Sequence, residues 1–437
     1  MLKYLYVVIS VFVMVAGSIL PVAADEPLTK SHPDLGWPAL SEEVWREASP
    51  EAVQAELRAG AEVDSRGGDY AFTALMFAAR HNENPEVFEA LLDAGANLEA
   101  RNEYGGTAFR IAAENTGNPE VIEMLLDAGA DVSARNESGW TALMLTAYSN
   151  ENPEVIETLL GAGADVSARD NGGWTALMWG ANTENPEVVE TLLDAGADVN
   201  ARTKRGQTAF MHAARWNENP EVFQALLDAG ADVGARDEHG TTALMQAARR
   251  TDYFEVIEML LDAGADVKAR DELGWTALMW GANADNPEVI EMLMDAGADV
   301  SARDERGQTA FMHAARWNEN PEVFQALLDA GADVGARDDD GWTALLMATR
   351  YNKNPEITEI LLNAGADLEA RTDDEETALI LAAEANENPE VVEVLLDAGA
   401  DASAETPGGE SAWDLIQENE ALLGTSAYWR LNDLRFR

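Results

Sequence analysis

The residues of this sequence that could carry acid–base or metal chemistry are its five histidines and its many carboxylates. His212 and His313 occupy the same position in two copies of one block, 101 residues apart (313 minus 212), and His32, His81 and His239 lie in other contexts. That distribution does not give the paired spacing of a metal site or of a catalytic dyad. Acidic pairs occur throughout the chain, so none of them stands out. We therefore predict that the protein is not an enzyme and that it needs no metal and no cofactor.

Two further chemical motifs are excluded by their details. The run Asp338-Asp339-Asp340-Gly341 lacks the alternating acids and the distal Glu of a calcium loop, and we interpret it as a turn. No glycine loop follows a strand-like segment, as a phosphate-binding loop would. The absence of cysteine excludes disulfides, thiolate zinc sites and iron–sulfur clusters.

The overall charge restricts the class of partner. The chain carries 80 Asp and Glu against 29 Lys and Arg, a formal net charge of −51. Such a chain repels phosphate, so we expect it to bind no nucleic acid and no anionic bilayer. Because 46% of the residues are hydrophobic, they can still fill a core.

The first 24 residues differ from the rest. Lys3 precedes the apolar run Tyr4 to Leu20, and Val22-Ala23-Ala24 supplies the small residues that a signal peptidase recognises. We predict a signal peptide over 1–24 and a linker over 25–40. The protein would then be exported, either to the periplasm or to the extracellular medium, without membrane insertion after cleavage. An uncleaved anchor is the alternative, since the run is close to the minimum length for a span.

The elements behind these residues come from an internal repeat. Ala-Gly-Ala motifs recur every 33 to 35 residues, and their glycines are Gly60, Gly95, Gly129, Gly163, Gly196, Gly230, Gly264, Gly297, Gly331, Gly365 and Gly399. A period of this length indicates a solenoid whose units cannot fold alone. In a sample unit, Thr208 is the N-cap of a short helix and Asn219-Pro220 begins a second one. Gly230 ends the second helix, and a turn-rich segment leads to the next unit.

These motifs resemble the ankyrin repeat over roughly residues 41–437. The segments Gly-x-Thr-Ala-Leu-Met-x-Ala-Ala and Pro-Glu-Val-Ile-Glu-x-Leu-Leu-Asp-Ala-Gly-Ala-Asp-Val carry the resemblance. It implies an all-α ankyrin-repeat solenoid of about ten to eleven helix-turn-helix units with β-turn fingers. We place the solenoid at 41–405 and expect capping units at both ends, the last of them a C-terminal capping segment over 406–437.

The sequence departs from the family pattern at two places. The Pro and His of Thr-Pro-Leu-His are absent, and Asn-Glu-Asn-Pro replaces the usual Gly-His turn between the two helices. Because that His links neighbouring units in the family, we expect packing and capping to hold the units together here. Arg205 to Asp237 is also identical to Arg306 to Asp338, which we interpret as a duplication of three repeats rather than as a site.

One arginine recurs in each unit beside Asp or Asn. The members are Arg66, Arg101, Arg135, Arg169, Arg202, Arg236, Arg270, Arg303, Arg337 and Arg371. We interpret this series as a row of ion pairs to acids of adjoining units, which contribute little individually.

The positions that vary between units indicate a binding face. The resemblance implies that the finger tips and the inner ends of the first helices line a concave groove. Its candidate residues are Trp140, Trp174, Trp275 and Trp342 before the helix-opening Thr, with Arg215, Trp216, Arg249, Arg250, Arg316, Trp317, Arg350 and Tyr351 after the first helix. Exposed Trp and Arg are typical interface anchors, although Trp rings that pack only on their neighbours are the alternative.

One unit breaks its own pattern. Arg249 to Glu255 replaces the usual Asn-Glu-Asn-Pro-Glu and puts Tyr253 where other units have the capping Asn. Local inconsistencies of this kind occur at functional sites, and sequence drift is the alternative.

Together these features predict an exported, non-enzymatic protein that binds a protein or peptide partner through an Arg/Trp-lined concave groove. A carbohydrate or cell-wall binding module is one alternative, because indole rings stack on sugars. A secreted effector directed at a host is another.

The charge imbalance leads to a prediction about salt. Like charges on a chain of −51 oppose compaction, and added ions screen them. The melting temperature should therefore rise as NaCl increases from low concentration to about 0.5 M, where the Debye length is well under 10 Å. Thermal melts followed by circular dichroism check this, and a flat or falling curve would show that local ion pairs outweigh the general repulsion.

Overall fold

A computed structural model describes residues 42–68, 70–150, 152–250 and 253–434 of the 437-residue chain. The predicted signal peptide (1–24), the predicted linker (25–40) and residue 41 lie outside the described residues. The chain divides into two compact units, residues 1–137 and 138–437. We call their described parts the N-terminal unit (42–137) and the C-terminal unit (138–434).

All regular structure in the described residues is helical, apart from isolated β-bridges in the finger loops. The N-terminal unit contains α1 (Glu42–Arg46), α2 (Pro50–Arg58), α3 (Ala74–His81), α4 (Pro85–Asp93), α5 (Ala108–Asn115) and α6 (Pro119–Asp127). In the C-terminal unit, the first helices of the repeats are α7 (Ala142–Ser149), α9 (Ala176–Gly180), α11 (Ala209–Trp216), α13 (Ala243–Ala248), α15 (Ala277–Gly281), α17 (Ala310–Trp317), α19 (Ala344–Tyr351), α21 (Ala378–Ala385) and α23 (Ala412–Ile416). The helices that follow them are α8 (Pro153–Gly161), α10 (Pro186–Asp194), α12 (Pro220–Asp228), α14 (Phe254–Asp262), α16 (Pro287–Asp295), α18 (Pro321–Asp329), α20 (Pro355–Asn363), α22 (Pro389–Asp397) and α24 (Ser426–Leu434). The predicted all-α architecture is confirmed.

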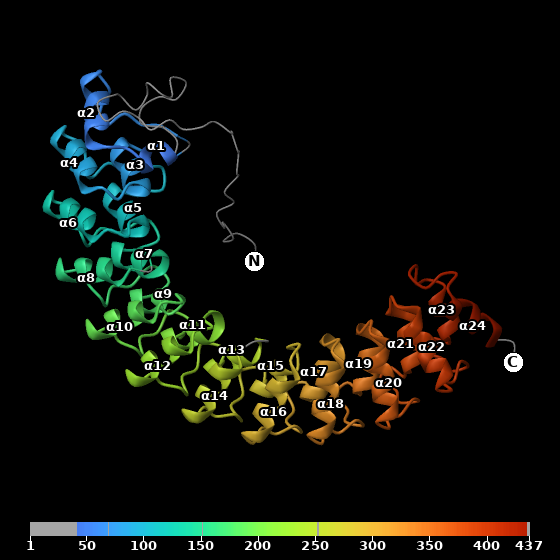
Figure 1. The fold of residues 1–437 in the computed structure, drawn as a ribbon. Coiled ribbons are helices and arrows are strands. Elements are labelled where there is room, and N and C mark those ends of the chain that lie inside the picture. Colours follow the sequence, from blue (N-terminus) through green and yellow to red (C-terminus); the bar gives the residue numbers. More distant parts are fainter. Residues whose placement is uncertain (1–41, 69, 151, 251–252, 435–437) are drawn as a thin grey trace. The chain divides into compact units, whose positions relative to one another are not determined.

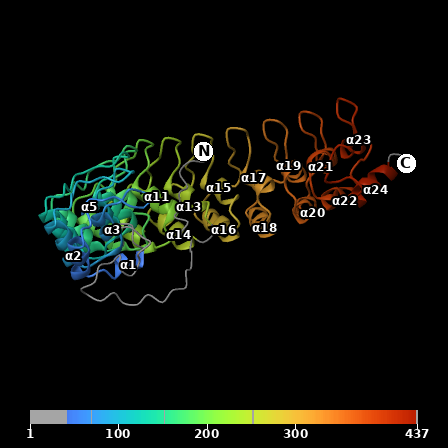
Figure 2. The same ribbon diagram turned by 90° about the horizontal axis from the view of Figure 1, so that it is seen from above.

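Within the C-terminal unit these helices form two rows. The first helices lie on the inner, concave side and the second helices on the outer side (Figure 1). The loops that join one repeat to the next project to one side as separate fingers (Figure 2). The concave side is therefore bordered by first helices and by the bases of the fingers.

The caps predicted from the sequence define each repeat. The Thr208 side chain accepts from the Met211 N–H at the start of α11, and the Asn219 side chain accepts from the Glu221 N–H at the start of α12. Such caps each contribute about 1 kcal/mol. After α12 ends, Gly230 adopts φ 82°, which a residue with a Cβ resists.

The core lies between the two rows. In α12, Val222, Phe223 and Leu226 are completely buried, and Phe210 of α11 contacts Phe223 with 5.9 Å between ring centroids. Equivalent positions are buried in the other second helices. Because each helix pair buries only part of its apolar surface by itself, stacking of repeats completes the core.

At the start of the described chain, α1 buries Val44 and Trp45. Helix α2 then begins after Ser49, whose side chain accepts from the Ala52 N–H. Helix α24 lies within the predicted capping segment, and it buries Ala427 and Leu431 while Trp429 stays exposed. The capping role of the two ends stays a prediction.

The asparagines of the Asn-Glu-Asn-Pro loops link neighbouring repeats. The Asn318 Nδ2 atom donates to the carbonyls of Ala282 (3.0 Å) and Ala284 (2.7 Å), at the C-terminal end of the preceding first helix. Its Oδ1 atom accepts from the Asn320 N–H at 2.8 Å. The same double contact is made by Asn82, Asn217, Asn352, Asn386 and Asn419. Our expectation that packing and capping alone join the units was wrong, because these amides satisfy helix-end carbonyls of the previous repeat.

The arginine series also differs from the expected row of ion pairs. The guanidinium of Arg202 donates to the carbonyl of Arg236 (2.7 Å), and that of Arg303 to the carbonyl of Arg337 (2.6 Å). Arg66, Arg169, Arg236, Arg270, Arg337 and Arg371 donate in the same way to the carbonyl one repeat further on. The ion pairs of this series are long, as between Arg202 and Asp232 at 4.0 Å. The acceptor is the backbone carbonyl of the next arginine in the series, or that of Glu405 at its end.

The asparagine contacts give a test of what joins the repeats. Replacing Asn318 by Ala leaves two carbonyls and one N–H of the repeat boundary without their partner. We expect the free energy of unfolding to fall by about 3 kcal/mol, measured by urea denaturation. The matched control is Asn363→Ala, at an exposed position at the end of α20, which should change stability by less than about 0.5 kcal/mol. Equal effects of the two substitutions would show that the amide does not join the repeats.

Candidate functional site

Aromatic side chains gather along the concave side of the C-terminal unit. The predicted Trp140 and Trp174 both pack on Trp179 of α9, each with ring centroids 4.2 Å apart, and Tyr148 closes the group at 5.4 Å from Trp179. Helix α9 has only five residues, and a Cβ at Gly180 would lie 3.2 Å from side chains of α10. Glycine there lets the helix bearing Trp179 sit directly on α10.

A hollow of about 710 Å³ opens between the fingers and the first helices of two adjacent repeats. Its lining residues are Leu273, Trp275, Trp280, Asn283, Asp304, Glu305, Arg306, Gln308, His313, Arg316 and Trp317. Trp275 and Trp280 lie 4.7 Å apart, and the guanidinium of Arg249 lies 4.7 Å from the Trp280 ring centroid. A smaller hollow of about 430 Å³ adjoins it and shares Asn283 and Trp317.

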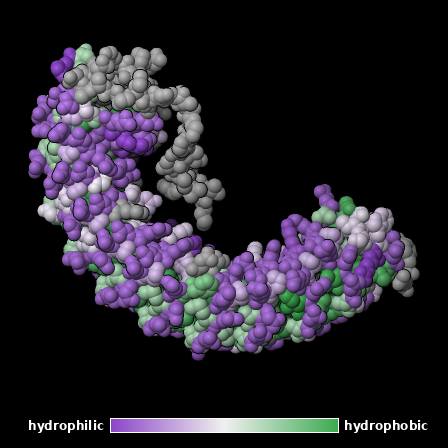
Figure 3. All heavy atoms as spheres, in the orientation of Figure 1, coloured by the Kyte–Doolittle hydropathy of each residue, from purple (hydrophilic) through white to green (hydrophobic). Residues whose placement is uncertain are grey.

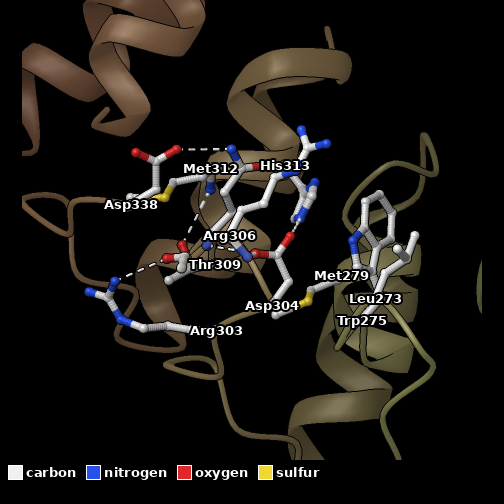
Figure 4. A network of polar contacts seen from close by, with 12 residues as sticks. Leu273, Trp275, Met279, Arg303, Asp304, Arg306, Thr309, Met312, His313 and Asp338 are labelled. Atoms are coloured by element: carbon white, nitrogen blue, oxygen red, sulfur yellow. Dashed lines mark hydrogen bonds and ion pairs between the residues drawn. The ribbon is translucent and has the colours of Figure 1, made fainter. Parts of the chain in front are cut away.

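A buried carboxylate organises the floor of the larger hollow. Asp304 Oδ1 accepts from the N–H groups of Arg306 and Gln308, both at 2.8 Å, which fixes the base of the finger. Its Oδ2 lies 3.0 Å from His313 Nε2 (Figure 4). Burial raises the pKa of Asp304, but the hydrogen bonds from His313, Gln308 and Arg306 outweigh burial and lower it overall. The Asp304 carboxylate therefore fixes the backbone of its finger and orients the His313 imidazole.

The fingers on either side use the same device with different donors. Asp271 Oδ1 accepts from two N–H groups of its finger, and its Oδ2 lies 3.3 Å from the Trp280 indole nitrogen. Asp338 likewise accepts from its finger and from the Gln308 amide at 2.9 Å. In these three fingers, one carboxylate oxygen accepts from the finger backbone while the other orients a side chain of the groove.

The two histidines of the duplicated block have different surroundings. Trp275 lies over His313 at 4.1 Å and Trp174 over His212 at 3.8 Å. His212, however, has Thr203 where His313 has Asp304. The Thr203 hydroxyl accepts from its finger, and no carboxylate is present there to pair with an imidazolium. Burial, with a smaller effect of Arg215, therefore lowers the pKa of His212 to about 4.

A third group surrounds the end of α17. The Arg316 guanidinium lies between two rings, 4.9 Å from the centroid of Trp317 and 4.5 Å from that of Tyr351. Trp342 stacks near Tyr351 at 6.0 Å, and Arg350 lies 5.8 Å from the same ring. Trp317 is 62% exposed, so one face of the group remains open to solvent.

The arginines of the groove differ in their partners. Arg350 pairs with Glu384 at 2.6 Å, and Arg250 pairs with Glu218 at 3.5 Å and turns toward Tyr253. In the described part of the chain, no carboxylate oxygen lies within 4.0 Å of the guanidinium groups of Arg215, Arg249 and Arg316. Burial, with the nearby Arg215, also lowers the pKa of Arg249. In a protein of 80 acidic residues, these three cations thus differ from Arg250 and Arg350, which have a carboxylate partner.

The structure therefore divides the predicted residues into groups. Trp275, Arg316 and Trp317 line the large hollow, and Arg249 touches its wall through Trp280. Trp140 and Trp174 form a separate aromatic group, and Arg215 stacks on Trp216. Tyr351 lies against Arg316, and Trp342 stacks near Tyr351. The binding role of these residues stays a prediction.

Sequence reasoning missed Trp179 and Trp280, together with Arg306. The two tryptophans occupy the position after Thr-Ala-Leu-Met, where other units have residues such as Gln246 or Met347. The residue type at this position varies between repeats, and the same kind of variation indicated the other groove residues. Helix α14 has no side-chain N-cap, as the sequence indicated, because Tyr253 occupies the N-cap position and its side chain is buried.

Comparison with protein families identifies the repeat. The family described as ankyrin repeats (3 copies) matches residues 43–136, 130–203, 197–271, 268–338 and 311–406. The chain belongs to the ankyrin-repeat family. Ankyrin-repeat proteins are in general non-enzymatic scaffolds for protein–protein interaction. A comparison with curated proteins gave no match.

Two negative findings for this ankyrin-repeat protein concern metals and membranes. Within the described ranges, no three His, Asp or Glu side chains come together as ligands of a metal ion would. None of the helices in that same part of the chain is long and apolar enough to cross a bilayer.

The burial of His212 can be measured by titration. Because the pKa of His212 is about 4 in the folded protein and 6.5 for a histidine exposed to water, the unfolded state binds more protons between these values. The stability lost through His212 between pH 7 and pH 5 should be about 2 kcal/mol. His212→Gln, which copies Gln246 of another unit, should remove that part of the pH dependence of urea unfolding. An NMR titration in which His212 has a midpoint near 6.5 would contradict the burial argument.

Proposed function

We propose that this ankyrin-repeat protein is exported and binds a protein or peptide partner through the concave groove of the C-terminal unit. The observation that carries the proposal is the set of Arg215, Arg249 and Arg316, which stack on tryptophans and have no carboxylate within 4.0 Å in the described chain. Stacked guanidinium groups lose little side-chain entropy on binding and present their donors to an incoming carboxylate. The partner side of this interface is accordingly acidic.

The charge of the whole chain adds specificity to this arrangement. Hydrophilic residues make up most of the visible surface, and apolar residues form separate patches among them (Figure 3). Glu187, Glu221 and Glu288 on the second helices are exposed. An acidic protein of −51 repels anions in general and accepts those that reach the arginines of the groove.

Binding of a carbohydrate is the second candidate, and the smaller hollow favours it. That hollow combines the exposed Trp317 with the polar side chains of Asn283, Asp285, Glu319 and Asn320. An indole face beside amides and carboxylates matches the apolar face and hydroxyls of a sugar ring. Inhibition of partner capture by free sugar would favour this candidate over a protein partner.

The arginines give the test of the protein-binding groove. Arg215→Glu, Arg249→Glu and Arg316→Glu reverse the charge at the unpaired positions without removing core volume. Each should weaken capture of a partner from an extracytoplasmic extract by about 2 kcal/mol or more, measured as the apparent affinity in a pull-down titration. Circular dichroism should show unchanged folding.

The matched controls are Glu187→Gln, Glu221→Gln and Glu288→Gln on the outer row of helices. These variants should capture the partner as the original protein does. If they fail while the arginine variants bind normally, the interface lies on the convex side and the groove is not the binding site.

A further inference from the structure

The groove of the C-terminal unit contains the same set of side chains twice. Besides the identical stretch from Arg205 or Arg306 onward, Gly173–Asn182 is identical to Gly274–Asn283. In each copy the two stretches belong to adjacent repeats, and in the second copy both of them line the large hollow. We call Trp174, Trp179, His212, Arg215 and Trp216 the first cleft, and Trp275, Trp280, His313, Arg316 and Trp317 the second cleft.

The two clefts share their side chains and several distances, although the paired tryptophan rings are stacked at 21° in the first cleft and tilted at 52° in the second. The distance between the two paired tryptophans is 4.2 Å in the first cleft and 4.7 Å in the second. The stacked arginine lies 4.8 Å from Trp216 and 4.9 Å from Trp317. Trp216 is 54% exposed and Trp317 is 62% exposed. Each cleft thus pairs an unpartnered guanidinium of the described chain with an open indole face.

The surroundings of the clefts are not repeated. The position of Tyr148 beside the first cleft is taken by Arg249 beside the second, and the position of Arg250 is taken by Tyr351. What recurs is therefore the set of cleft side chains, together with an arginine stacked on an exposed tryptophan.

We propose that the two clefts hold one extended polypeptide at two points, with an acidic side chain of the partner at Arg215 and another at Arg316. This inference rests on the proposed function of the groove. An adjacent apolar side chain of the partner covers the open ring of Trp216 or Trp317 at each point. The unpaired guanidinium selects the acidic anchor, and the indole selects the apolar one.

The spacing of the clefts sets the spacing of the anchors. The clefts are three repeats apart, and helices pack about 8 to 10 Å apart, which places them about 24 to 30 Å from each other. An extended chain advances about 3.3 Å per residue, so the two anchors are separated by about seven to nine residues. Binding at one cleft raises the effective concentration at the other, and this avidity amounts to about 10² or more.

The fingers beside the two clefts differ in charge, and this difference predicts which cleft binds an acidic anchor more strongly. The first cleft has Thr203 and Lys204, a charge of +1, where the second has Asp304 and Glu305, a charge of −2. The difference is three charges (+1 minus −2). The first cleft is therefore the stronger site for an acidic anchor.

A displayed library of random 20-residue peptides, selected on the full chain, tests this inference. The enriched peptides should carry two acidic residues, each beside an apolar one, about seven to nine residues apart. Arg215→Glu and Arg316→Glu should each weaken such a peptide by about 10² in Kd, with the larger loss for Arg215→Glu. Peptides cut to a single anchor should bind the original protein about 10²-fold more weakly than the full peptide does.

The controls separate this inference from the proposed function. Glu221→Gln and Glu322→Gln alter the outer helices of the same two duplicated repeats and should leave binding unchanged. If the enriched peptides depend on one of the two arginines alone, or carry one acidic anchor, the groove binds but the two-point inference is wrong. If no enriched peptide depends on either arginine, both the inference and the proposed groove are wrong.

Discussion

The structure depends on the fact that no repeat can complete its own core or satisfy its own helix ends. Val222, Phe223 and Leu226 are completely buried, because the helices of neighbouring repeats lie against α12 in addition to α11 of its own repeat. At the same boundary, the Asn318 amide supplies donors to carbonyls that the short first helix leaves open. Hydrogen bonding is directional, whereas the burial of apolar side chains is not. The hydrogen bonds therefore set the register in which the apolar faces of neighbouring repeats meet.

The repeated hydrogen bonds also explain how a chain of −51 can remain compact. The arginines of the recurring series donate to carbonyls of the next repeat, so their contribution does not need an acidic partner. The acids of the second helices stay exposed, where water and ions screen them. Cohesion between the repeats and repulsion on the surface thus involve different groups.

The groove uses the same elements for another purpose. The aspartates at the finger bases use one oxygen to shape the finger and the other to orient His313, Trp280 or Gln308. Trp280, which Asp271 orients, in turn lies against the guanidinium of Arg249. His313 Nδ1 and Asn283 Oδ1, which also line the large hollow, have no hydrogen-bond partner in the described chain. The outer indole rings of Trp216 and Trp317, on which Arg215 and Arg316 stack, are exposed.

Sequence alone determined the elements of this fold, because their signals are local. The Thr and Asn-Pro caps, the apolar positions of the second helices and the glycines after them lie within a few residues of the helix ends they define. The same reasoning found most of the Trp and Arg residues of the groove, since they vary where neighbouring positions repeat.

Only the tertiary structure decided which groups meet across a repeat boundary. The partners of Asn318 lie 34 and 36 residues earlier, and the carbonyl partner of Arg303 lies 34 residues later. Sequence could not tell that Arg350 is paired with Glu384 while Arg316 is held between two rings. Nor could the identical helices around His212 and His313 show their different environments, which depend on whether Thr203 or Asp304 reaches the imidazole. Such contacts follow from the stacking distance and the direction of each side chain, which local sequence patterns do not encode.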